Sequence, residues 1–127
     1  MTDSPSSTSL RPPTMSDSLQ DVMKDKEQRW LERGGYRTPG ITIEQAAREM
    51  GTNRSYLSKY LNEVCHVTFY EWVAQMRINE AKSLLLAERD LSIERISSMV
   101  GFSSPSTFSS AFKKIVGESP KMWRNHQ

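Results

Sequence analysis

Two segments of the chain repeat one pattern of apolar residues and glycines about 50 positions apart. The matched pairs are Ile43 with Ile93, Gly51 with Gly101, Leu57 with Phe108, and Leu61 with Phe112. The first two pairs differ by 50 positions and the last two by 51, so the second copy carries one extra residue between them. A chance match would not keep a constant offset between the two segments, change it by one residue and then keep the new offset. The chain therefore contains two copies of one structural unit.

Each copy reads as two short helices joined at a glycine. In the second copy, apolar residues recur at i, i+4, i+7 and i+8, which is one stripe on a helix: Phe108, Phe112, Ile115 and Val116. Gly101 stands at the expected end of the preceding helix. Helices often end at a residue in the left-handed conformation, which glycine adopts at the lowest cost. Gly117 and Pro120 end the second helix. This arrangement predicts a helix-turn-helix, whose second helix can lie in the major groove of DNA.

A helix is expected between the two units, over residues 68–87. Its apolar residues show helical spacing: Trp72, Val73, Met76, Ile78, Ala81, Leu84 and Leu85. About 18 helical residues span about 27 Å. That length suits a connection between two units that enter successive turns of the major groove, which lie about 34 Å apart. Arg77 lies among these apolar neighbours, and we expect it to form an internal ion pair with a glutamate such as Glu80.

The N-terminal part divides into a tail and a helix. Residues 1–16 are rich in Ser, Thr and Pro and have few large apolar residues, so they are expected to form a disordered tail or linker. Asp17 or Ser18 is expected to cap a helix that runs to about Arg33 and ends at Gly34. Thr42 and Gln45 have the spacing of a capping box at the start of the first unit.

These patterns together predict an all-α chain of about seven helices. The expected boundaries are residues 42–66 for the first helix-turn-helix, 68–87 for the linker helix and 92–117 for the second, within a domain of residues 17–127. Trp30 is expected to be a core residue, as are Tyr56, Phe69, Phe108 and Trp123.

The C-terminal segment carries ten characteristic residues within 24 positions: Gly101, Phe102, Phe108, Phe112, Lys113, Lys114, Gly117, Pro120, Trp123 and Arg124. This pattern resembles the signature of the AraC/XylS family of transcription regulators. The family resemblance extends over residues 19–125 and implies sequence-specific binding to promoter DNA. His66 falls where the family often has a helix-ending glycine, as Gly117 is in the second unit.

The resemblance and the helix-turn-helix geometry together indicate which side chains reach DNA. A helix-turn-helix reads bases from the exposed N-terminal half of its second helix. The base-facing candidates are Arg54, Ser55, Ser58 and Lys59 in the first unit and Pro105, Ser106, Thr107 and Ser110 in the second. The phosphate-contacting candidates are Thr52, Asn53, Ser104, Lys113 and Lys114. Because hydroxyls reach less far than long side chains, we expect the first unit to provide most of the base readout.

The resemblance further implies a regulator, usually an activator, that acts through RNA polymerase in the cytoplasm. Many family members join this domain to a sensor domain, which does not fit in residues 1–40. The chain is then either a short stand-alone regulator or the C-terminal piece of a longer protein. The net charge is only +2. Because this is a weak nucleic-acid signal, a helical protein-interaction module with degenerate DNA binding remains the alternative.

Other classes of function lack the residues that they need. The single cysteine, Cys65, excludes an internal disulfide and fits a reducing compartment. With Cys65, His66 and His126 as the only Cys and His residues, a four-ligand zinc site is not expected. The sequence has no glycine-rich phosphate loop and no Ser/His/Asp set, so we expect no cofactor and no enzyme. No apolar run approaches the roughly 20 residues of a membrane span.

Overall fold

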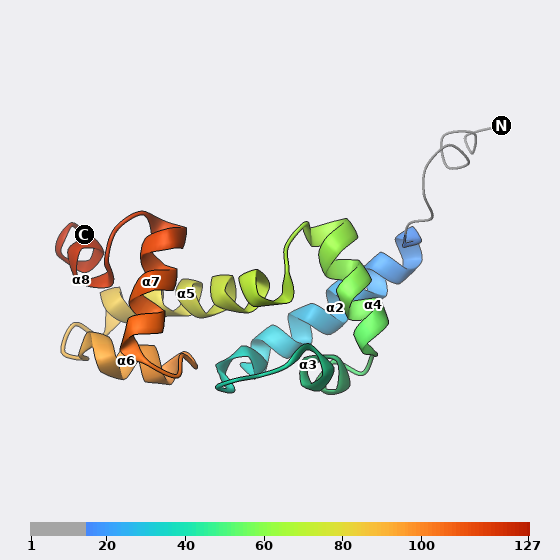
Figure 1. Cartoon of the computed structure of the whole chain (residues 1–127), viewed down its shortest axis with the longest axis horizontal. Helices are drawn as coiled ribbons and strands as arrows, with labels where there is room; N and C mark the ends of the chain where they lie inside the picture. The colour runs from blue at the N-terminus through green and yellow to red at the C-terminus, as the bar shows by residue number, and fades with distance from the viewer. Residues whose placement is uncertain (1–14) are drawn as a thin grey trace.

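The computed structural model describes residues 15–127, and within them every regular element is a helix. The elements are α2 (Asp17–Glu32), η1 (Gly35–Arg37), α3 (Ile43–Glu49), α4 (Arg54–Tyr60), η2 (Leu61–Cys65), α5 (Phe69–Ala87), α6 (Ile93–Met99), α7 (Pro105–Val116) and α8 (Pro120–Asn125). Over the described residues the seven α-helices confirm the predicted fold class. Figure 1 shows α5 as the central helix, with α2, α3 and α4 at one end and α6, α7 and α8 at the other.

The expected N-terminal tail lies mostly outside the described residues, which begin at Met15. Met15 is buried at 3% exposure, and its backbone N–H donates to a Glu63 carboxylate oxygen at 3.0 Å. The expected caps of α2 are wrong, because Ser16 is the N-cap and its hydroxyl accepts from the Leu19 N–H. Met15 and Ser16 therefore belong to the folded domain, which begins before the predicted start at residue 17.

Short polar side chains begin the remaining α-helices, as their residue types favour. Asn53, Ser92 and Ser104 each accept from the backbone N–H three residues later. Thr42 accepts from the Gln45 N–H in the same way, but the Gln45 side chain donates to Glu49 at 3.0 Å. The capping box predicted there is thus half formed, and the complete box lies at Thr68 and Glu71 instead.

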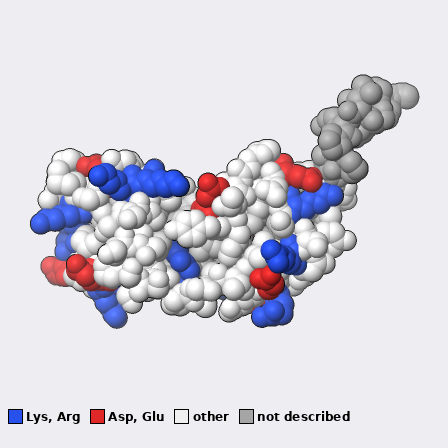
Figure 2. Space-filling model, viewed as in Figure 1, with Lys and Arg blue, Asp and Glu red and all other residues white. Residues whose placement is uncertain are grey.

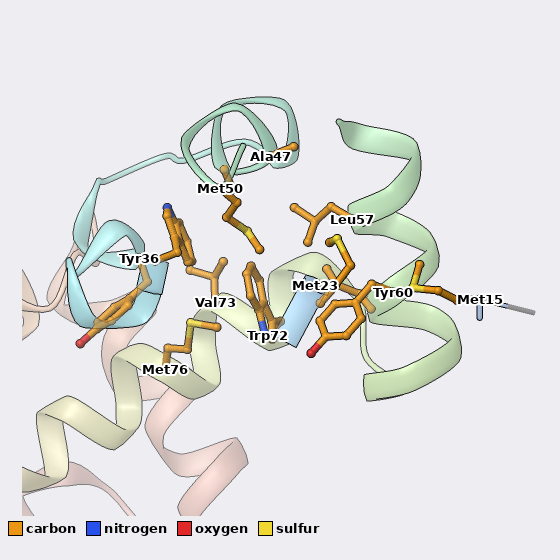
Figure 3. Packing of buried hydrophobic residues seen from close by; sticks show 13 residues of the cluster. Met15, Met23, Tyr36, Ala47, Met50, Leu57, Tyr60, Trp72, Val73 and Met76 are labelled. Carbon is orange, nitrogen blue, oxygen red and sulfur yellow. The ribbon is translucent and has the colours of Figure 1, made fainter. Parts of the chain in front are cut away.

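Two separate hydrophobic clusters form the core, one in each unit. The first joins α2, α3, α4 and the N-terminal part of α5, and its centre is Trp30 stacked on Trp72 with ring centroids 5.2 Å apart. Figure 3 shows Trp72 between Val73 on one side and Met23 and Tyr60 on the other. Trp30 is fully buried and its indole N–H donates to Glu49 at 2.8 Å, which confirms its predicted core role.

The second cluster joins the C-terminal part of α5 to α6, α7 and α8. Phe108 lies between Phe102 and Phe112, with ring centroids 5.4 and 5.7 Å away, and Phe112 meets Trp123 edge-on at 5.8 Å. The apolar stripe predicted for α7 fills this core through Phe108 and Phe112. Ile115 is the member of the stripe that is exposed.

Two predicted contacts are wrong. Tyr56 was expected in the core, but 48% of it is exposed, because Leu57, Tyr60 and Leu61 already cover the buried side of α4. Arg77 does not pair with Glu80. It donates to the backbone carbonyl oxygens of Tyr36 and Thr38 at 2.7 and 2.9 Å.

The end of the second helix in the first unit differs from its counterpart. α4 passes into the π-helical turn η2, and His66 ends it with φ 58°, which is left-handed. Gly117 ends α7 in the same left-handed region with φ 105°. His66 therefore adopts the conformation of a helix-ending glycine although it carries a side chain.

Candidate nucleic-acid interface

The second helices of the two units, α4 and α7, stand at opposite ends of α5. Figure 1 shows them upright in the same view, and the chain runs in the same direction along both. Each follows a seven-residue helix, α3 or α6, across a turn that contains a left-handed glycine, Gly51 or Gly101. The repeat in the sequence therefore becomes a repeat in space, with one candidate reading helix in each unit.

The core decides which face of α4 points outward. Leu57, Tyr60 and Leu61 are buried, and at about 100° per residue the opposite face carries Ser55 and Lys59. Asn62 continues this face at the start of η2.

Among the α4 candidates, Arg54 and Ser55 are exposed, whereas Ser58 and Lys59 are partly exposed. The four predicted base-facing residues thus lie on or beside the outward face of one helix.

On α7, Phe108, Ala111 and Phe112 are buried, so the opposite face carries Ser106, Ser110 and Lys113. The predicted residues on this helix are all exposed: Pro105, Ser106, Thr107, Ser110, Lys113 and Lys114.

The outward faces of the two helices correspond residue by residue at the offset of 51 positions. Ser55 matches Ser106, Lys59 matches Ser110, and Asn62 matches Lys113. Asn62 is exposed and was missed among the candidates, although the offset applied to Lys113 would have found it. Tyr56 was also missed, because it was assigned to the core. It takes the position of Thr107 and places an aromatic ring at the edge of the outward face.

The candidates for phosphate contact differ in the hydrogen bonds that their polar groups already make within the protein. The backbone N–H of Thr52 donates to the Ala47 carbonyl oxygen at 2.9 Å, so this amide is not available to a phosphate. The Asn53 side-chain oxygen accepts from the Tyr56 N–H at 2.9 Å, which leaves its amide nitrogen as the donor. Ser104 caps α7 through the Thr107 N–H at 3.2 Å, and its hydroxyl lies 2.9 Å from the Thr107 hydroxyl.

An ion pair links the two helices of the first unit beside the outward face. The Arg54 guanidinium contacts the Glu44 carboxylate at 2.8 Å, and the two side chains are 66% and 49% exposed. Exposed pairs contribute little stability, so a phosphate can compete for this guanidinium. On the face drawn in Figure 2, basic side chains lie over both ends of the described chain, with acidic side chains interspersed among them.

No arrangement for metal or thiol chemistry accompanies these helices in the described part of the chain. Residues 15–127 contain no group of three His, Cys, Asp or Glu side chains placed to hold a metal ion. Burial raises the pKa of the Cys65 thiol, which opposes formation of a reactive thiolate. None of the described helices is long and apolar enough to cross a lipid bilayer.

Comparison with known proteins places both units in one family. The model of a family described as "Helix-turn-helix domain" matches residues 46–126. The "Probable transcription factor PqrA" of Proteus vulgaris is 35% identical over 108 residues, which are 85% of this chain and 84% of that protein. Other relatives are longer, and the chain spans between 22% and 34% of their length.

Solved structures share the fold. The C-terminal domain of AraT, a response regulator from Geobacillus stearothermophilus, superposes with a TM-score of 0.72 at 26% identity and covers 84% of this chain and 85% of its own. The DNA-binding domain of AdpA, solved in complex with a target DNA, has a TM-score of 0.67 at 22% identity. It covers 87% of this chain and 93% of its own.

Proposed function

The chain belongs to the AraC/XylS family of helix-turn-helix transcription regulators, and we propose that it inserts α4 and α7 into successive major-groove turns of promoter DNA. Its family and fold are those of DNA-binding regulators and not of enzymes. In this proposal residues 17–127 form the DNA-binding domain. Its units are residues 42–66 and 92–117, joined by the linker helix of residues 68–87.

The observation that best supports this proposal is the pair of matched helices at the two ends of α5. A helix of 19 residues, such as α5, is about 28 Å long, close to the roughly 34 Å between successive turns of the major groove. Two helices that run in the same direction can then meet one face of the duplex (Figure 1). Any remaining mismatch is met by bending the DNA, at a cost of order 1–6 kcal/mol.

The side chains suggest different work for the two helices. On α4, Lys59 can donate to guanine O6 and N7, and Ser55 and Ser58 can donate to either base type at short reach. On α7, one hydrogen-bonding position of the Thr107 hydroxyl is taken by Ser104, and the Thr107 methyl group can contact a thymine methyl. We therefore assign most direct base readout to α4, with Arg54 beside it. Positioning, phosphate contact and shape readout are assigned to α7.

The remaining assignments extend the family resemblance to this chain. The proposed candidates for phosphate contact are Thr52, Asn53, Ser104, Lys113 and Lys114. The proposed setting is the cytoplasm, and the proposed effect is activation through contact with RNA polymerase. A sensor domain that would bind the inducing ligand stays a prediction.

A salt titration of duplex binding tests the proposed function. With about four phosphates neutralised, the affinity should fall roughly 100-fold between 50 and 200 mM salt. A scrambled duplex of the same composition is the control, and it should bind more weakly at every salt concentration. If the chain shows no saturable duplex binding even at low salt, the alternative of a protein-interaction module is favoured.

A further inference from the structure

The two hydrophobic clusters do not merge, which raises the question of what fixes the angle between the two units. Along α5 the first cluster ends at Met76 and the second begins at Ile78. With two separate cores on one helix, the two units can bend or twist relative to each other. Contacts that cross the boundary between the two clusters would prevent this. Contacts that cross this boundary can then help to fix the position of α4 relative to α7.

Such contacts converge on the segment 36–38, which lies between α2 and the first unit and packs against the middle of α5. Two arginines hold it from opposite directions. Arg77 of α5 donates from Nε to the Tyr36 carbonyl oxygen and from Nη2 to the Thr38 carbonyl oxygen, at 2.7 and 2.9 Å. Arg37 of the segment donates from Nε and Nη2 to the two oxygens of Glu80 on α5, at 2.8 and 2.6 Å. Paired donors of this kind fix orientation as well as distance.

The Glu80 carboxylate also accepts a hydrogen bond from Tyr36. The Tyr36 hydroxyl donates to Glu80 Oε1 at 3.1 Å. Burial raises the pKa of this hydroxyl and Glu80 raises it further, so it stays a donor at neutral pH. Glu80 therefore receives three hydrogen bonds from two consecutive residues of the segment 36–38.

The same segment touches the turn of the second unit. Gly101, between α6 and α7, lies so close that a β-carbon built on it would be 2.7 Å from the Arg37 carbonyl oxygen. The Arg77 guanidinium also lies over the ring of Phe102, 5.3 Å from its centroid. The segment is thus wedged between α5 and the second unit. We call this set of contacts the inter-unit joint: Tyr36, Arg37, Arg77, Glu80, Gly101 and Phe102.

We propose that the inter-unit joint sets which spacing of DNA half-sites the protein accepts, with Arg37 and Glu80 as positioning residues. The inference rests on the proposed function, because spacing matters only if both α4 and α7 enter the groove. One base pair rotates a half-site by about 34° and moves it by about 3.4 Å. A rigid joint forces the DNA to absorb such a change, at an elastic cost. A loosened joint lets the units move instead, so the spacing preference weakens.

The test compares binding to a duplex series in which one base pair is removed or added between the half-sites. The variant is Glu80→Ala, and the control is Asp25→Ala. Asp25→Ala also removes one negative charge and one ion pair with an arginine. That pair joins Asp25 to Arg29 on the exposed surface of α2 at 3.0 Å. We expect Glu80→Ala to reduce the affinity ratio between the cognate and the shifted sites by roughly three- to tenfold. Asp25→Ala should leave that ratio at the wild-type value.

A distance measurement without DNA provides the second readout. Spin labels on Asp21→Cys and Lys121→Cys, both exposed positions, report the separation of the units in a Cys65→Ala background. The distance distribution should be narrow in the parent protein and with Asp25→Ala, and broader with Glu80→Ala. A spacing ratio that stays at the wild-type value with Glu80→Ala overturns the proposal, whether or not the distribution broadens. If the wild-type chain binds no duplex, the proposed function fails. In that case, an unchanged distance distribution with Glu80→Ala also overturns the claim that the inter-unit joint holds the units in place. A broader distribution with Glu80→Ala supports that claim.

Discussion

Lys59 is the side chain that combines a central place on the outward face of α4 with a positive charge. If it contacts a base, Lys59→Ala should cost about 1–3 kcal/mol of specific binding and relax the preference at one base pair. Fluorescence anisotropy on the cognate duplex and its single-base variants, at one fixed salt concentration, measures both effects. Lys24→Ala is the matched control, since Lys24 is an exposed lysine on α2. An equal loss on every duplex would make Lys59 a phosphate contact instead.

Glu27 joins three helices through one carboxylate. Its two oxygens accept from the Tyr60 hydroxyl at 2.6 Å and from the Trp72 indole N–H at 2.8 Å. Both donors are buried, so Glu27→Ala leaves them without a partner and should lower the free energy of unfolding by about 1–3 kcal/mol. Urea unfolding measures the loss. The exposed control Asp25→Ala should stay within about 0.5 kcal/mol of wild type. Equal losses in the two variants would show that these hydrogen bonds contribute no stability.

At the scale of elements, the turn between α6 and α7 depends on Gly101 for two reasons. Its φ is 108°, and the Arg37 backbone occupies the place of a β-carbon. Gly117 separates the two effects, because its φ of 105° is similar and no atom lies within 4 Å of a β-carbon there.

Gly117→Ala should therefore lower the free energy of unfolding by the backbone strain alone, about 1 kcal/mol or more, and lower the melting temperature with it. Gly101→Ala should lower it further. If the two variants melt at the same temperature, the close approach of Arg37 to Gly101 does not exist in solution.

The contact between α2 and α3 carries a pH dependence. The hydrogen bond from Trp30, followed by the one from Gln45, lowers the pKa of the Glu49 carboxyl. A carboxyl with a lowered pKa in the folded state stabilises the fold above its unfolded pKa of about 4.3. That contribution is lost as the pH falls through the folded value.

Glu49→Gln should thus be slightly less stable than wild type at pH 6, by under about 1 kcal/mol because the group is largely exposed. The gap between the two proteins should narrow as the pH falls from 6 to 3. Urea midpoints at both pH values measure this, and an undiminished gap at pH 3 would exclude the charge of Glu49 as its cause.

The sequence predicts the helices well because their signals are local. Glycines, N-cap residues and apolar spacing all act within a few residues, and the repeat supplies each signal twice. The partners of Arg77 were not predictable in this way, since they are carbonyl oxygens 39 and 41 positions earlier in the chain. Tyr56 was misassigned because an aromatic residue in a helix suggests the core, whereas the buried side of α4 was already filled. Asn62 could have been found from the repeat alone.

At the scale of the whole molecule, the protein is two small cores on one helix with a joint between them. Each core holds one outward-facing helix in place, and the inter-unit joint relates one helix to the other. Unequal base readout is expected, because α4 carries Lys59 and Arg54 whereas α7 offers Ser and Thr until Lys113. A scan of every base pair in the site would detect this difference as larger penalties in the half-site that α4 meets. Equal penalties in the two half-sites would contradict the division of labour.

The central claim is that two helices on one rigid frame read two half-sites on one face of the duplex. Selection of bound duplexes from a random pool, followed by sequencing, tests it most directly. We predict enrichment of two half-sites whose centres lie about 10–10.5 base pairs apart, with the sharper base preference in one of them. Enrichment of a single short half-site, or of no common sequence at low salt, would contradict the account.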